Sequence, residues 1–221
     1  MLNDVGKGVK YIVTDYTCNY LTRYQEQKQS SRVTIDNIRR ILSSFFAWLE
    51  DEDLERMRDK CTELRDLAII DMLASTGMRV GEMVLLNRAD INFAERECGV
   101  FDKGSKERVV YFDARTKIHL QNYLNSRTDQ NSALFVSLKA SHERLEIGGI
   151  EVRLREMGKK LDIPKVHPHK FRRTLATMAI DKGMPVEQLQ RLLGHQKIDT
   201  TMQYAMVKQS NVKLAHKKYI G

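Results

Sequence analysis

Apolar residues recur at intervals of three and four along most of the chain, which is the spacing of one face of an α-helix. In the segment 34–49 the large apolar residues run from Ile35 to Leu49 and form one such face. The spacing therefore predicts helices at 14–27, 34–49, 54–61, 64–75, 78–86, 115–126, 148–161, from Pro168, at 186–193, around Tyr204 and at 210–220.

The segment between residues 89 and 113 has a different pattern, in which short apolar runs are separated by turn residues. It predicts three short strands at Ile91–Phe93, Gly99–Phe101 and Arg108–Phe112. Gly104 and Ser105 predict a tight turn between the last two strands. The fold class is therefore expected to be mainly α with a small antiparallel β-sheet, an α+β fold.

Composition narrows the class of partner. The chain has 221 residues, a formal net charge of +8 and 42% hydrophobic residues, so we expect a packed core and an anionic partner, most commonly nucleic acid. Its three cysteines, Cys18, Cys61 and Cys98, are scattered, which favours reduced thiols over a disulfide scaffold or a zinc site. No apolar run approaches about 18 residues, so we expect a cytoplasmic protein without a membrane span.

The candidate chemistry is concentrated near the C-terminus. His169 and Arg172 lie three residues apart in H-K-F-R, His195 follows in L-G-H, and Tyr204 comes nine residues later. Taken singly, a histidine or arginine on a basic surface is usually solvated, and a tyrosine near a helix end is usually packing. Together, these groups could stabilise the charge on a phosphodiester under attack without a metal.

This set of spacings resembles the tyrosine recombinase (integrase) family. T-G-M-R-V-G-E at 76–82 is similar to the family's first box, which supplies an arginine. D-K-G-S-K-E-R at 102–108 resembles its β-hairpin, with Asp102 where the family more often has glycine. The resemblance implies a tyrosine recombinase catalytic domain whose catalytic residues are Arg79, Lys103, His169, Arg172, His195 and Tyr204.

The resemblance also implies the role of each group. Tyr204 would attack the scissile phosphate and form a 3′-phosphotyrosine, while Arg79 and Arg172 would hold the non-bridging oxygens. Lys103 would protonate the departing 5′-oxygen as general acid. His169 would help to deprotonate the tyrosine or orient the phosphate. The chemistry requires neither a metal nor a cofactor.

His195 would donate a hydrogen bond to a phosphate oxygen. The partner would be double-stranded DNA, bound through further basic residues. Two of these, Lys106 and Arg108, could instead shape the hairpin. The expected DNA-binding residues are Arg39, Arg40, Lys106, Arg108, Lys170 and Arg173.

The expected organisation is a truncated helical core-binding part at 1–53, followed by the catalytic domain at 54–221. A C-terminal tail helix at 210–220 would dock on a neighbouring protomer, with a tetramer on DNA. The favoured function is a site-specific recombinase that integrates or excises a mobile element or acts as a resolvase. Two alternatives remain: a type IB topoisomerase, which acts alone, and a DNA-binding remnant with weakened cleavage because its N-terminal part is short.

Overall fold

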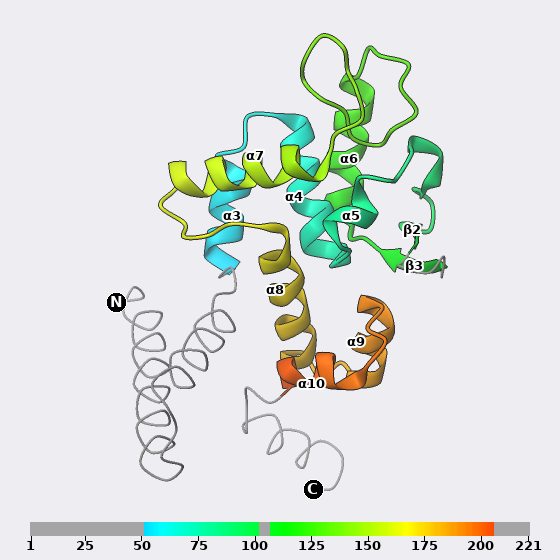
Figure 1. Ribbon diagram of the computed structural model, residues 1–221, viewed down its shortest axis with the longest axis vertical. Coiled ribbons are helices and arrows are strands. Elements are labelled where there is room, and N and C mark those ends of the chain that lie inside the picture. The colour runs from blue at the N-terminus through cyan, green and yellow to red at the C-terminus, as the bar shows by residue number, and fades with distance from the viewer. Residues whose placement is uncertain (1–50, 102–106, 206–221) are drawn as a thin grey trace, which may run out of the picture. The chain divides into compact units, whose positions relative to one another are not determined.

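The structure, a computed structural model, describes residues 51–101 and 107–205, which all lie in one compact unit, Leu49–Gly221. This part is mostly helical with one small sheet, which confirms the predicted fold class (Figure 1). The predicted helices before residue 50, the hairpin turn and the 210–220 helix lie outside the described residues. The elements are α3 (Asp51–Asp59), α4 (Leu64–Thr76), α5 (Val80–Met83), a 3-10 turn (Arg88–Asp90), β1 (Ile91–Asn92), β2 (Glu97–Phe101), β3 (Glu107–Tyr111), α6 (Ala114–Ser126), α7 (Ile147–Lys160), α8 (Pro168–Asp181), α9 (Val186–Leu193) and α10 (Ile198–Ala205).

Helix α4 is the centre of the main core, and it packs against α6 and α8 (Figure 1). Its apolar side chains, such as Ile70 and Leu73, are almost wholly buried. The same helix buries Asp71, whose carboxylate accepts a hydrogen bond of 2.6 Å from Arg58 of α3 and contacts His119 of α6. Because a buried charge must be paired, Asp71 fixes α3 and α6 to the centre of the domain.

The sheet has the order β1-β2-β3 and is antiparallel throughout, as predicted. Cys98 lies opposite Val110 on the face that is buried against the core. Gly99 lies opposite Val109 on the outer face, where Tyr111 is exposed. This alternation sends every second side chain of β3 toward the core, and Arg108 shares that inner side with Val110.

Helices α8 and α9 form a smaller apolar cluster, with Ala176, Leu189 and Leu193 at its centre, and α10 packs against both helices. The D-T-T sequence at 199–201 is typical of a helix N-cap, but helix α10 begins at Ile198 and already includes these residues. The N–H of Thr200 donates to the carbonyl of Lys197, which places 199–201 inside the first turn. Within the described ranges, no helix is long and apolar enough to cross a membrane.

Candidate active site

Five of the six predicted catalytic residues have a described backbone, and they come from four segments. Arg79 precedes α5, His169 and Arg172 lie on α8, and His195 follows α9. Tyr204 lies on α10, but its side chain is outside the described part. Also outside it are Lys103, Lys106, Arg39 and Arg40.

The side chain of Arg172 joins two helix ends. Its exposed fraction is only 5%, and its guanidinium donates to the carbonyl of Gly77 at 2.6 Å and to that of Leu193. Gly77 caps the C-terminus of α4, and Leu193 is the last residue of α9. Carbonyls at helix C-termini carry partial negative charge, which favours a cation at this point.

Arg79 reaches the same turn. Its guanidinium donates to the carbonyl of Gly194 at 3.1 Å and to the carboxylate of Glu82 at 2.9 Å. The two predicted phosphate-binding arginines therefore converge on the end of α9, directly before His195.

Gly194 must be glycine for two reasons. Its φ of +64° lies in the left-handed region, and a Cβ there would come within 2.9 Å of the Cδ and Nε atoms of Arg108. The turn that carries His195 is thus packed directly on the side chain of a residue from β3.

Glu82 is a functional candidate that the sequence analysis missed. Its exposed fraction is 5%, and it accepts hydrogen bonds of 2.6 and 2.8 Å from Arg108 and of 2.7 Å from the backbone N–H of Arg79. Burial acts to raise the pKa of Glu82, but the bonds from Arg108 and Arg79 outweigh it and hold the pKa below its ordinary value. The spacing of three residues in R-V-G-E, which allows a side chain to fold back on its own helix start, was the signal available.

Arg108 lies within the protein, with 12% of its side chain exposed. Besides Glu82, its guanidinium donates to the carbonyl of Leu192 at 3.3 Å. Of the two roles considered for it from the sequence, these contacts favour shaping the hairpin over binding the DNA backbone.

Lys170, one of the predicted DNA-binding residues, lies inside the domain rather than on its surface. Its side chain is buried, and its ammonium group donates to the carbonyl of Pro164. The loop between α7 and α8 returns over the first turn of α8, and this brings the carbonyl into reach. Arg173, three residues later in the chain, is half-buried.

His169 is on the exposed side of α8, with the ring of His167 6.3 Å away between centroids. Partial burial lowers the pKa of His169, and the positive charges of Arg172 and Arg173 lower it further. The neutral imidazole, which can accept a proton, is therefore favoured in the absence of an anion.

His195 is held from two sides. Its Nδ1 atom lies 2.8 Å from the hydroxyl of Thr201, and its carbonyl accepts a bond of 3.0 Å from the side chain of Gln190. Thr201 is not among the predicted site residues, because nothing in the sequence places its hydroxyl beside His195.

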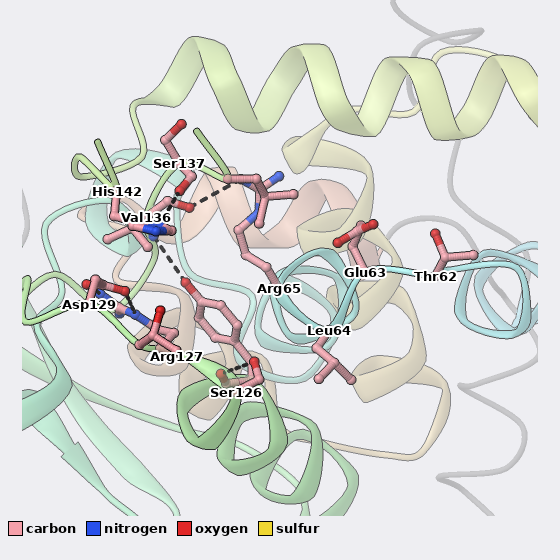
Figure 2. Close-up of a pocket in the computed structure, with 13 residues that line it drawn as sticks. Thr62, Glu63, Leu64, Arg65, Ser126, Arg127, Asp129, Val136, Ser137 and His142 are labelled. Atoms are coloured by element: carbon pink, nitrogen blue, oxygen red, sulfur yellow. Dashed lines mark hydrogen bonds and ion pairs between the residues drawn. The ribbon is translucent and has the colours of Figure 1, made fainter. Parts of the chain in front are cut away.

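A separate pocket of about 220 Å³ lies at the opposite end of α4 (Figure 2). Its charged groups stabilise the loop after α6, because Arg127 pairs with Asp129 at 2.5 Å and donates to the carbonyls of Ala133 and Leu134. Val136 donates its N–H to the hydroxyl of Tyr123 at 3.2 Å. None of the catalytic residues with described side chains lines this pocket, so it is not part of the candidate site.

The site thus gathers guanidinium and imidazole groups around one turn, which suits an anion with several oxygens. In the described part of the chain, no three His, Cys, Asp or Glu side chains are grouped so that they could hold a metal ion.

Known proteins share both sequence and fold with this chain. Residues 47–211 match the Phage integrase family. The chain is 35% identical over 173 residues to the tyrosine recombinase XerC of Staphylococcus aureus, and this match covers 75% of the chain and 57% of the relative. A further XerC sequence from that species is 33% identical over 165 residues, which is 71% of the chain and 55% of the relative. The chain therefore spans little more than half the length of these relatives.

Two solved structures have the same fold. The crystal structure of XerA recombinase aligns with a TM-score of 0.69 and 25% identity, over 93% of this chain and 82% of that one. The Tn1549 transposon integrase, solved in complex with transposon right end DNA, aligns with a TM-score of 0.67 and 18% identity, over 95% and 85% of the two chains. The resemblance predicted from the motifs is confirmed: the chain belongs to the phage integrase family of tyrosine recombinases.

Proposed function

We propose that this chain is a site-specific DNA recombinase that cleaves and rejoins DNA through a 3′-phosphotyrosine intermediate. The observation that carries the proposal is the convergence of Arg79, Arg172 and His195 on the end of α9, with the helix of Tyr204 packed against α8 and α9. Relatives named tyrosine recombinases, and a similar fold solved with transposon DNA, support the same function.

In the proposed mechanism, the hydroxyl oxygen of Tyr204 attacks the scissile phosphorus and its proton passes to the neutral imidazole of His169. Arg79 and Arg172 stabilise the charge on the non-bridging oxygens. Lys103 protonates the leaving 5′-oxygen. Because the phosphotyrosine keeps the energy of the phosphodiester, the reverse attack by a 5′-hydroxyl reseals DNA without a nucleotide cofactor.

The proposed partners are double-stranded DNA and further protomers, in a tetramer joined through the 210–220 helix. The proposed biological role is the integration or excision of a mobile element, or resolution. The proposed location is the cytoplasm. Deleting residues 209–221 should reduce recombination far more than binding to a single site, because only recombination needs neighbouring protomers. Equal losses in the two assays would mean that residues 209–221 pack on their own protomer and not on a neighbour.

Covalent capture of a nicked DNA substrate tests the chemistry. The wild-type chain should form a protein–DNA adduct, and Tyr204→Phe should form none while it still binds DNA, because only the nucleophilic oxygen is removed. Arg172→Ala should lose about 2–4 kcal/mol of transition-state stabilisation. Tyr111→Phe, on the outer face of the sheet, is the matched control and should react like wild type. An adduct with Tyr204→Phe would refute the assignment.

A further inference from the structure

Thr201 is buried in the first turns of α10, with an exposed fraction of 0%. Its hydroxyl oxygen lies 2.8 Å from Nδ1 of His195. In the described part of the chain this is its one side-chain hydrogen bond. Other helical hydroxyls in the domain behave differently, since Thr76 bonds the carbonyl of Met72 and Ser75 that of Asp71.

The burial of Thr201 favours one direction for this bond. A buried hydroxyl that does not donate its proton is unfavourable, because it has lost its hydrogen bonds to water. A Thr201 hydroxyl that donates to Nδ1 of His195, 2.8 Å away, avoids this cost. A neutral imidazole that accepts at Nδ1 carries its hydrogen on Nε2. His195 can then donate from Nε2 to a phosphate oxygen while the ring is neutral.

The position of Thr201 on α10 links the tautomer of His195 to the position of the nucleophile, Tyr204. Thr201 and Tyr204 lie three residues apart, which is about one turn of α10. Helix α10 packs against α8 and α9 (Figure 1). His195 directly follows Gly194, the residue that caps α9. Any movement that withdraws α10 from this place also withdraws the hydroxyl from His195.

We propose that Thr201 is a positioning residue that sets the Nε2–H tautomer of His195 only while the helix of Tyr204 is docked. The inference rests on the proposed roles of His195 and Tyr204. It makes the phosphate-binding histidine competent in the same step that presents the nucleophile, so a protomer with a displaced tyrosine helix also loses a properly oriented donor.

The experiment compares Thr201→Val, which removes the hydroxyl and nearly keeps the shape, with Thr201→Ser, which keeps the hydroxyl. Thr200→Val, at an exposed neighbouring position, is the matched control. The ¹⁵N shifts of His195 are measured in the full chain well above the ordinary histidine pKa of about 6.5. Wild type, Thr201→Ser and Thr200→Val should show the Nε2–H form, and Thr201→Val should show an increased share of the Nδ1–H form.

Single-turnover cleavage of the nicked substrate is measured on the same proteins. Thr201→Val should be slower by about 10- to 100-fold, by analogy with the loss of the partner that orients a metal-binding histidine. Thr201→Ser should recover most of the rate. In a His195→Gln background, Thr201→Val should have little further effect, because its partner is already absent.

The outcomes separate this inference from the proposed function. Unchanged ¹⁵N shifts in Thr201→Val, or a full additional loss in the His195→Gln background, would overturn the role of Thr201 while leaving the recombinase chemistry intact. Failure of the wild-type chain to form any adduct would overturn the proposed function and the catalytic part of this inference, although the shifts would still test the hydrogen bond.

Discussion

Replacing Arg108 by methionine tests the network that joins β3 to the active site. Arg108 donates to Glu82 at 2.6 and 2.8 Å, with exposed side-chain fractions of 12% and 5%. Breaking a buried ion pair costs about 3–5 kcal/mol when the remaining charge is left unpaired. Glu82 would keep its bonds to Arg79, so we expect the lower end of that range, about 3 kcal/mol.

A loss of that size should lower the melting temperature by about 6–12 °C for a chain of this length. The assay is urea and thermal unfolding of the whole chain without DNA. Arg115→Met is the matched control, because Arg115 pairs with Glu55 at 2.7 Å while both side chains are about half exposed. Exposed pairs contribute about 0–1 kcal/mol. If both substitutions cost the same, the buried network does not stabilise the domain as argued.

Two further predictions use the same assay. Gly194→Ala should destabilise the protein more than Gly183→Ala, because both positions have positive φ but only the new Cβ at 194 would meet Arg108; equal losses would mean that Arg108 moves aside without cost. His169→Gln should make stability less dependent on pH below about 6.5. The folded-state pKa of His169 is lowered by burial and by Arg172, so the unfolded chain binds more protons in that window and stability falls as pH falls. If the stability of His169→Gln depends on pH as that of the wild type does, another group causes the loss of stability at low pH.

Features set by local chemistry were predictable from the sequence. Helix α4 ends at Thr76 and is capped by Gly77 in a left-handed conformation, as its terminal glycine indicated. Helix α6 spans Ala114–Ser126, one residue from the predicted start, and the side chain of Asp113 caps it. In these cases the deciding groups lie within one turn of each other.

Features set by distant contacts were not predictable. In the sequence, Lys170 looks like one more basic residue of a DNA-binding surface. Only the structure shows that its ammonium group donates to the carbonyl of Pro164. The D-T-T sequence fits either a cap or a first turn, and the packing of Thr201 on His195 selects the second. Glu82 stands near Arg79 in sequence, but its second partner, Arg108, comes from a strand 26 residues away.

The anchoring of Arg172 and Arg79 by main-chain oxygens has a consequence for evolution. The carbonyls of residues 77, 193 and 194 belong to every amino acid, so no substitution at those positions deletes the acceptors. Sequence drift can displace these main-chain acceptors only by bending the two turns, and the glycines at 77 and 194, whose φ values are +60° and +64°, are the positions where it would do so. In distant homologues, the residue at position 193 should therefore change among apolar types. The glycines at 77 and 194 and the arginines at 79 and 172 should be retained.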